Sequence, residues 1–305
     1  MDPSQAFPVE LLYRPAALMT MRPKTRGNYT QRTDIVYAEA YGTGLVMDVF
    51  HPVSKASGYG VVDVIGSGWF ADRIALNEHI GLGVIDALCD HGLTVFAVSP
   101  GSVTLFTGLQ MVRHVHAALR HIKQGAEGYG INPHRIGILG ASAGGHLAAL
   151  AALTPQPGRR AAHAPLHRWS TTVAAAAVLF PPTDLVDYGC IRFDQFEIEG
   201  FDPGRLLFRE GLAGRTNAEI LDKLSALSPA RIPIAKPPPF MIIQGKADPI
   251  VPWDQAEKLA ASLRRAGGPV ILRYHETGGH VWPGINVELG DMAAWLAERL
   301  TDISV

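Results

Sequence analysis

Residues Gly140-Ala141-Ser142-Ala143-Gly144 form a GxSxG sequence, a pattern in which a serine can act as a nucleophile. The pattern directly follows the apolar run RIGIL and directly precedes a helical stretch, HLAALAAL. A sharp turn between a strand and a helix lifts the serine clear of the sheet, and glycines give the turn room because they lack a Cβ atom. The helix N-terminus behind Ser142 favours developing negative charge. We therefore predict that Ser142 is a nucleophile; a glycine-rich turn with only a packing role is the alternative.

A serine hydroxyl is a weak nucleophile that needs a base, and the base needs an orienting carboxylate. Asp248 follows the apolar run FMIIQG, and His280 lies in a glycine-flanked loop after ILRYH. Both residues come at the predicted C-terminal ends of strands, where α/β sheets bind their ligands. The chain order Ser, Asp, His is also the order expected when the nucleophile lies between a strand and a helix. We predict a triad of Ser142, Asp248 and His280.

Other residues compete for these roles. Three histidines lie on the helical stretch before the nucleophile strand, where solvated or packed roles suffice: His114, His116 and His121. His146 lies four residues past Ser142 on the same helix, and we expect it to pack rather than catalyse. His275 still lies within its strand, and Glu276 competes with Asp248 as the orienting carboxylate. Asp248 would otherwise be a simple turn residue before a proline.

The oxyanion of a tetrahedral intermediate needs backbone N–H donors. One donor should be Ala143, the residue after the nucleophile. The second should come from the glycine-rich loop Gly66-Ser67-Gly68-Trp69, where Gly68 or Trp69 can offer an amide without a bulky side chain in the way. An ordinary glycine-rich turn is the alternative for this loop.

The elements that must position these residues alternate along the chain. Apolar runs predict eight strands: Asp34–Ala40, Gly44–Phe50, Val61–Ile65, Thr94–Val98, Arg135–Leu139, Val173–Phe180, Phe240–Gln244 and Val270–His275. Several runs are continuously apolar, which is typical of strands covered on both faces. Amphipathic patterns predict helices at Leu109–Lys123, Asp254–Arg265 and Asp291–Leu300. The sequence therefore predicts an α/β fold with a mostly parallel central sheet and helices on both faces.

Two segments break the alternation of strands and helices. Residues 1–30 hold four prolines and little periodicity, and we interpret them as an N-terminal arm of a single domain over residues 1–305. Residues 181–238 are too long for a plain connection, and we interpret them as a small cap inserted over the C-terminal edge of the sheet. A passive, irregular excursion is the alternative for this segment.

Composition excludes several classes of function. The 27 basic and 28 acidic residues give a net charge of −1, without the basic patch of a nucleic-acid-binding or membrane-surface protein. Two cysteines, Cys89 and Cys190, make neither a disulfide framework nor a CxxC metal pair. No signal peptide is visible, so we expect a cytoplasmic protein; a secreted protein whose leader had been removed would give the same sequence.

The sequence resembles the α/β-hydrolase esterases of the hormone-sensitive-lipase and carboxylesterase type, and most of all the branch of acetyl-xylan and feruloyl esterases. The resemblance runs from about Asp34 to the C-terminus, and its most specific pieces are NPHRIGILGASAGGHLAA, GKADPIVPWDQAEKL and GGHVWP. It implies the α/β-hydrolase fold and a Ser142-Asp248-His280 triad. It also implies that no cofactor and no metal is needed.

One departure from this family concerns the oxyanion loop. Members usually carry His-Gly-Gly-x-Trp, whereas this chain has Ile65-Gly66-Ser67-Gly68-Trp69, so the histidine that braces the loop is absent. We expect the Ser67 hydroxyl to replace it by bonding to nearby backbone. Trp69 would then wedge the loop from the other side. The strand ending in VFAVSPGS also departs from the family, and it leaves Ser99 and Ser102 without an assigned role.

We expect a serine carboxylic ester hydrolase that cleaves short acyl esters, such as acetyl or feruloyl groups on a carbohydrate or another small molecule. An amide hydrolase of the aminopeptidase or aryl formamidase kind uses the same triad and is the alternative. A non-catalytic binding protein has no need for all three triad residues. We expect substrate contacts from residues of the oxyanion loop, the cap and the loop that carries the histidine: Ser67, Phe70, Tyr188, Arg192, Phe193 and Trp282.

Overall fold

A computed structural model of the protein describes residues 27–196 and 201–302. Eight strands form one sheet: β1 (Tyr29–Ala40), β2 (Thr43–Pro52), β3 (Gly60–Val64), β4 (Thr94–Val98), β5 (Ile136–Ala141), β6 (Ala175–Leu179), β7 (Phe240–Gly245) and β8 (Val270–His275). All eight correspond to the strands predicted from the apolar runs, with ends that differ by a few residues. The N-terminal arm predicted over residues 1–30 lies mostly outside the described residues, and β1 already begins at Tyr29.

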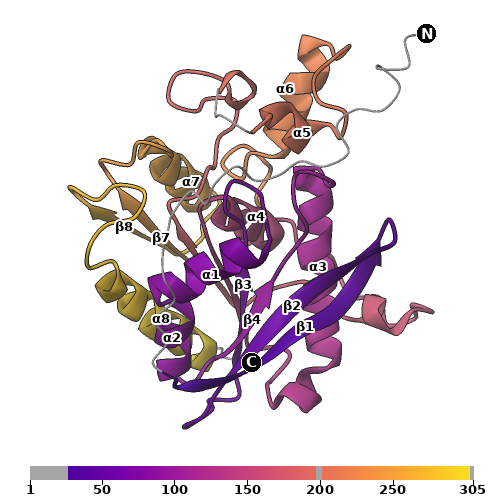
Figure 1. Ribbon diagram of the computed structural model, residues 1–305, viewed down its shortest axis with the longest axis vertical. Helices are drawn as coiled ribbons and strands as arrows, with labels where there is room; N and C mark the ends of the chain where they lie inside the picture. The colour runs from indigo at the N-terminus through magenta and orange to yellow at the C-terminus, as the bar shows by residue number, and fades with distance from the viewer. Residues whose placement is uncertain (1–26, 197–200, 303–305) are drawn as a thin grey trace.

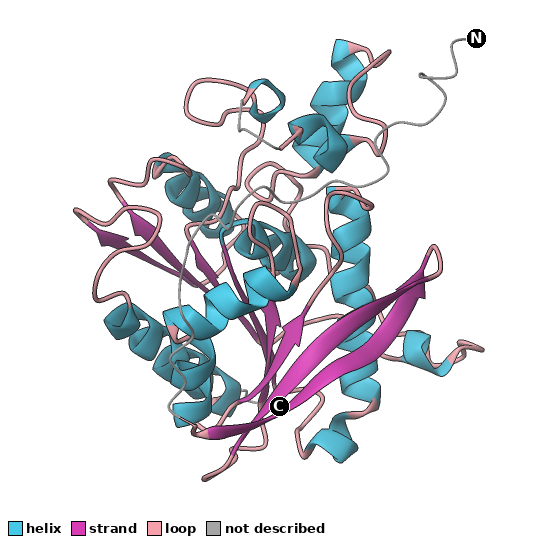
Figure 2. Ribbon diagram, in the orientation of Figure 1, coloured by secondary structure: helices cyan, strands magenta, loops and turns pink. Residues whose placement is uncertain are grey.

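The sheet has the order β1-β2-β4-β3-β5-β6-β7-β8. The strands β3 to β8 pair in parallel, whereas β1 and β2 form an antiparallel hairpin at one edge, seen as the long twisted ribbon in Figure 2. The mostly parallel sheet predicted from the sequence is therefore confirmed. Since parallel strands end at the same edge, the loops after β3, β5, β7 and β8 are brought to one side of the molecule.

Helices cover both faces of the sheet (Figure 1). One layer packs on β5 and its neighbours and consists of α3 (Gly108–Gln124), α4 (Ser142–Leu153) and α7 (Asp254–Arg265). The other consists of α1 (Arg73–Leu82), α2 (Val84–Asp90) and α8 (Asn286–Thr301). The patterns at residues 109–123 and 254–265 predicted α3 and α7, while α1 and α2 were not predicted. Within the described residues, short 3₁₀ turns lie at Ala126–Tyr129, Pro165–Arg168 and Phe193–Gln195.

The connection between β6 and β7 contains the segment 181–238, and its described residues form no strand of the sheet. It carries two short helices, α5 (Pro203–Leu207) and α6 (Asn217–Ala226), which project from one end of the body in Figure 1. Leu206 and Leu227 pack against Gly108 at the start of α3. We keep the name cap segment for residues 181–238, and its role as a cap stays a prediction.

A buried ion pair joins α1 to β3. Asp63 lies in β3 with no exposed surface, and both of its carboxylate oxygens lie within 3.0 Å of Nδ1 of His79 in α1. The loop of residues 65–72 connects these two elements, so the pair fixes the elements on either side of it. Burial lowers the pKa of the His79 imidazole, but the charge and hydrogen bond of Asp63, together with the charge of Glu78, raise this pKa by more, so it lies above its ordinary value.

Substituting Asp63→Asn should lower the free energy of unfolding by about 3 kcal/mol or more near pH 6, because it leaves His79 without its buried partner. A histidine whose pKa is raised on folding contributes its full stability below its unfolded pKa of about 6.5, and this contribution is lost as the pH rises through the folded value. The difference between wild type and variant in urea unfolding should therefore be smaller at about pH 9 than at about pH 6. An equal difference at both values would contradict this account of the pair.

Candidate active site

Strand β5 runs directly into a strained turn at Ser142, the first residue of α4. Ser142 has a φ of 52°, a left-handed conformation that is rare for a residue with a side chain and costs about 1–3 kcal/mol. The surrounding glycines permit the turn: a Cβ atom on Gly140 would lie 2.5 Å from backbone atoms of Gly144, and one on Gly144 would lie 2.1 Å from the Val64 oxygen. This strand–turn–helix arrangement is the one that the GxSxG sequence predicted.

Three side chains from separate loops meet beside this turn. Nε2 of His280 lies 3.0 Å from the Ser142 hydroxyl oxygen, and Nδ1 of His280 lies 2.8 Å from Oδ2 of Asp248. The Asp248 carboxylate is fully buried and His280 is 8% exposed. This is a hydrogen-bonded order of nucleophile, base and carboxylate, in which the imidazole can take the serine proton. The structure thus brings together the three residues that the sequence singled out.

The Asp248 carboxylate is held by the loop that follows β7. Oδ1 accepts hydrogen bonds from the backbone amides of Ile250 (2.8 Å) and Val251 (2.9 Å). Oδ2 also accepts one from the side-chain amide of Gln244, at 3.2 Å. A buried carboxylate needs several donors because it has lost its water. Its orientation toward His280 therefore depends on the shape of this loop.

The His280 ring is fixed by contacts on its other side. It packs on the ring of Phe180, whose centroid is 4.4 Å away, and Phe180 has a φ of 39° at the end of β6. The loop before His280 lies directly on the Asp248 loop, because Ala247 N–H donates to the Gly278 oxygen at 2.9 Å. A Cβ atom on Gly245 would lie 2.3 Å from that same oxygen. The base and its carboxylate therefore lie on two loops packed without space between them.

The competing residues form other contacts. His114 bonds to the Pro100 oxygen and His116 to the Ala151 oxygen, and burial lowers the pKa of both imidazoles. Burial also lowers the pKa of His121. His275 packs on Trp282, with ring centroids 5.0 Å apart, and Glu276 forms a 2.9 Å ion pair with Lys246. None of these contacts joins a competing residue to Ser142.

The loop after β3 forms a tight turn beside the nucleophile. Ser67 and Phe70 exchange two backbone hydrogen bonds of 2.9 and 3.0 Å, and the two residues between them, Gly68 and Trp69, have φ values of 57° and 61°. The loop contacts the nucleophile turn directly, because Gly144 N–H donates to the Gly66 oxygen at 3.1 Å. This hydrogen bond joins the loop to the start of α4, where Ala143 lies, and the oxyanion role of its amides stays a prediction. The bracing role of the Ser67 hydroxyl stays a prediction.

The residues expected to contact substrate lie in different surroundings. Phe193 is 1% exposed and packs on Trp69 and Tyr188, so its contacts favour seating the cap segment over forming a pocket wall. The Arg192 guanidinium is bound to Asp194 and Asn217. Trp282 is 4% exposed and packs on Phe180 and His275, and Phe70 is half-buried at the end of the turn that it closes with Ser67. Substrate contact by these residues stays a prediction.

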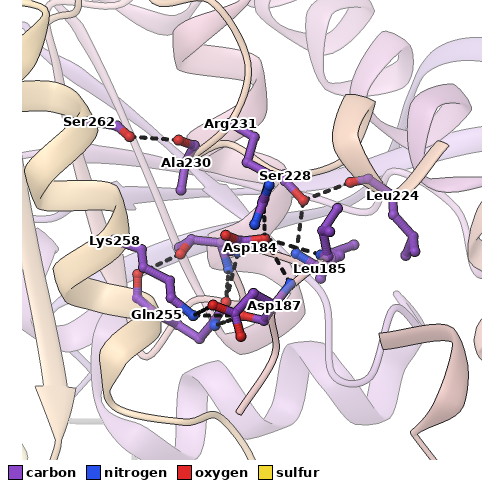
Figure 3. A network of polar contacts seen from close by, with 12 residues as sticks. Asp184, Leu185, Asp187, Leu224, Ser228, Ala230, Arg231, Gln255, Lys258 and Ser262 are labelled. Carbon is purple, nitrogen blue, oxygen red and sulfur yellow. Dashed lines mark hydrogen bonds and ion pairs between the residues drawn. The ribbon is translucent and has the colours of Figure 1, made fainter. Parts of the chain in front are cut away.

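Tyr188 joins the cap segment to the Asp248 loop. Its hydroxyl donates a 2.9 Å hydrogen bond to the Ile250 oxygen, while the Ile250 amide donates to Asp248. Burial, and then the nearby acidic groups, raise the pKa of Tyr188, so its phenol keeps the proton that it donates. The start of the cap segment is also fixed to α7 by buried Gln255, whose oxygen accepts a 2.7 Å bond from the Asp184 amide (Figure 3).

The same network extends to the end of the cap segment. In Figure 3, Ser228 accepts a hydrogen bond from the Leu185 amide and donates one to the Leu224 oxygen, at 2.8 and 2.6 Å. Arg231 also forms an ion pair with Asp184. The two ends of the cap segment are therefore bound to each other and to the body of the protein.

Sequence reasoning missed several residues that position the site. His146 was expected only to pack, but it accepts a 3.0 Å hydrogen bond from the Trp69 indole. A signal was available, since His146 is the one imidazole in a helix whose other residues after Ser142 are glycine, alanine or leucine. A buried polar side chain in such a helix must find partners. Gln244 carried the same signal, because it is a polar side chain in the buried, otherwise apolar strand β7.

The BD-FAE family model matches residues 47–263. Two relatives come from Mycobacterium tuberculosis. Esterase LipQ is 31% identical over 163 residues, which are 52% of this chain and 35% of LipQ; the probable carboxylic ester hydrolase LipM is 29% identical over 250 residues, which are 80% of this chain and 54% of LipM. The chain thus spans about a third to a half of the length of these relatives.

Solved structures share the fold. A truncated carbohydrate esterase from gut microbiota has a TM-score of 0.76 at 23% identity, with 93% of this chain and all of that chain covered. An acetyl ester-xyloside bifunctional hydrolase from Caldicellulosiruptor lactoaceticus has a TM-score of 0.69 at 20% identity, with 93% and 96% covered. At these identities the likeness shows the α/β-hydrolase fold. No group of His, Cys, Asp or Glu suited to a metal, and no helix long and apolar enough to span a membrane, occurs within residues 27–196 and 201–302.

Substituting Tyr188→Phe should lower kcat, with KM nearly unchanged, because the Ile250 carbonyl loses its donor and the loop that orients Asp248 loosens. The free energy of unfolding should fall by about 1–3 kcal/mol, the cost of a buried acceptor left without a partner. Steady-state kinetics on a nitrophenyl ester and urea unfolding measure both. Tyr129→Phe is the control. Tyr129 precedes β5, at the edge of the sheet where the parallel strands begin and opposite the site, and its ring packs on Phe96 of β4. Tyr188→Phe with the kinetics and stability of this control would contradict the positioning role.

Proposed function

The chain belongs to the BD-FAE family of acetyl-xylan and feruloyl esterases, and we propose that it hydrolyses carboxylic esters with Ser142 as its nucleophile. The observation that carries the proposal is the 3.0 Å contact from the Ser142 hydroxyl to His280, with Asp248 2.8 Å from the far side of the imidazole. A serine in this arrangement is activated for attack on an acyl carbon. The fold shared with esterases supports the same reaction class.

The reaction proceeds in two halves. His280 accepts the Ser142 proton as the hydroxyl oxygen attacks the ester carbonyl, and the negative oxygen of the tetrahedral intermediate is bound by backbone amides. The imidazolium then gives its proton to the departing alcohol, which leaves an acyl-enzyme on Ser142. Water, activated by the same imidazole, attacks the acyl carbon and releases the acid. Asp248 keeps the imidazole in the tautomer and orientation that both halves require.

The oxyanion site consists of the Ala143 amide and an amide of the turn, from Gly68 or Trp69. The described residues accept no hydrogen bond from the amides of Gly68 and Trp69, so these donors are available to a substrate oxygen. Both residues have the left-handed conformation and lie at the tip of the turn closed by Ser67 and Phe70. The hydrogen bond from the Gly144 amide to the Gly66 oxygen, which joins this loop to the nucleophile turn, supports this role.

We propose short acyl esters as substrates, with acetyl or feruloyl groups on a carbohydrate as the finer assignment. The family supports this choice, and so do two structural neighbours described as a carbohydrate esterase and as an acetyl ester-xyloside hydrolase. An oligosaccharide or another small molecule would carry the ester. Amide substrates remain the second class to be tested, because the same triad serves amide hydrolysis.

A fluorophosphonate should label the protein at Ser142, since the reagent reacts with an activated serine. The label is located by mass spectrometry of the digested protein. Ser142→Ala should abolish labelling and lower kcat by about 10³-fold or more, because the nucleophile is lost. Ser54→Ala, at an exposed loop position, is the control and should behave like wild type. A label on another residue, or full activity in Ser142→Ala, would overturn the proposed nucleophile.

A panel of substrates tests the acyl class. Nitrophenyl acetate, acetylated xylo-oligosaccharides and methyl ferulate should be hydrolysed with a higher kcat/KM than aminoacyl and formyl anilides. Because nitrophenoxide is a better leaving group than nitroanilide, each kcat/KM is divided by the rate constant for uncatalysed hydrolysis of the same substrate before nitrophenyl acetate and nitroacetanilide are compared. Higher kcat/KM for the anilides would point to an amide hydrolase, and the ester assignment would be withdrawn.

A further inference from the structure

We call the turn from Ser67 to Phe70 the oxyanion turn, and no imidazole stands just before it in the chain. Ile65 stands at that position, fully buried in the apolar layer between the sheet and α1, α2 and α8. The turn that follows holds Trp69 in the left-handed region, where a residue with a side chain persists only if its surroundings impose that conformation. The contacts of Trp69 therefore determine how the turn is held.

Two of the three polar groups of Trp69, its carbonyl and its indole N–H, have hydrogen-bond partners. Its carbonyl accepts a 2.9 Å hydrogen bond from the Val103 amide, and its indole Nε1–H donates a 3.0 Å bond to Nδ1 of His146. The indole is 4% exposed, and it stacks on Phe201 at 5.7 Å and meets the edge of Phe193 at 5.1 Å. The third group, the backbone amide of Trp69, has no acceptor among the described residues.

His146 can serve the indole only in one protonation state. Since Nδ1 accepts from Trp69, the proton must lie on Nε2, which donates a 2.6 Å hydrogen bond to the Leu227 oxygen. The ring has no exposed surface, and burial lowers the pKa of His146 to about 4, so the imidazole is neutral at physiological pH. This tautomer is thus fixed by two partners and by burial together.

The two hydrogen bonds of His146, to Trp69 and to Leu227, join three parts of the molecule. His146 lies one helical turn after Ser142 in α4, Trp69 lies in the oxyanion turn, and Leu227 follows α6 in the cap segment. Phe193 and Phe201, which pack on the indole, come from the cap segment as well. The helix that carries the nucleophile and the cap segment therefore both contact the turn at the Trp69 side chain, in addition to the backbone contact between Gly66 and Gly144.

We propose that His146 is a positioning residue for the oxyanion site: by accepting the Trp69 indole proton it holds the Gly68–Trp69 turn against the nucleophile helix. This inference rests on the proposed esterase function, because the turn matters only if its amides bind a developing oxyanion. His146 touches neither the substrate nor the reacting atoms, and it acts through Trp69.

His146→Phe should lower kcat by at least about 10-fold and at most by the 10²–10³-fold expected when an oxyanion donor is lost. KM should change by less than about threefold. Trp69→Phe should give a similar loss, and the double variant should be no slower than the slower single variant, because both remove the same hydrogen bond. His146→Gln should restore part of the kcat, since its amide can both accept from the indole and donate to the Leu227 oxygen.

His116→Phe is the matched control. His116 is also buried, and its imidazole also bonds to a backbone carbonyl, that of Ala151 in α4, but it contacts neither the turn nor the triad. It should lose a comparable amount of stability and keep its kcat. Equal kcat values for His146→Phe and His116→Phe, or a loss confined to KM, would overturn the inference. If the esterase function itself were wrong, wild type would fail to be labelled at Ser142, which is a separate result.

A second measurement does not depend on activity or on a folded variant. In ¹⁵N NMR spectra of the wild-type protein, His146 should appear as the neutral Nε2-protonated tautomer from about pH 5 to pH 8, while the Trp69 indole proton exchanges slowly with water. A His146 that titrates near its ordinary value, or that carries its proton on Nδ1, would also overturn the inference.

Discussion

The close crossing of two backbone segments is the constraint on which the site depends. The end of β3 and its loop, from Val64 to Gly66, lie against the turn from Gly140 to Gly145 with no room for a Cβ atom on either side. A methyl group on Gly66 would come within 2.9 Å of the Gly144 nitrogen. Because of this contact, the strained turn that presents Ser142 and the loop that carries the oxyanion amides cannot move independently. Glycine is required here for close approach rather than for flexibility.

Buried hydrogen bonds extend this constraint to the other residues of the site. Asp248 is held by the backbone of its own loop, and Tyr188 from the cap segment binds that loop in turn. His146 holds Trp69 and is itself bound to Leu227 of the cap segment. The cap segment thus contacts both the carboxylate side and the oxyanion side of the site. Such contacts are costly to break in a dry interior, which favours a site already arranged before substrate arrives.

The sequence predicted well the features that are local. Several strands are continuous apolar runs, all eight strands were found, and the GxSxG pattern lay between a strand and a helix as expected. The match to the BD-FAE family confirms the resemblance drawn from the motifs. Long-range partners were not predictable, because His146 meets Leu227 across 81 residues and Asp63 meets His79 only once α1 packs on the sheet. Phe193, expected as a pocket wall, was ambiguous for the same reason: an aromatic side chain in an irregular segment fits a pocket wall or a buried seat equally well until its neighbours are known.

The central claim is that Ser142 attacks an acyl group while backbone amides bind the oxyanion. A crystal structure of the protein inhibited by a small alkyl fluorophosphonate tests it most directly, because the bound phosphonate has the geometry of the tetrahedral intermediate. The account predicts phosphorus bonded to the Ser142 oxygen. It also predicts a phosphoryl oxygen within about 3 Å of the Ala143 amide and of the Gly68 or Trp69 amide. Phosphorus on another residue, or a phosphoryl oxygen in solvent with both turn amides pointing away, would contradict it.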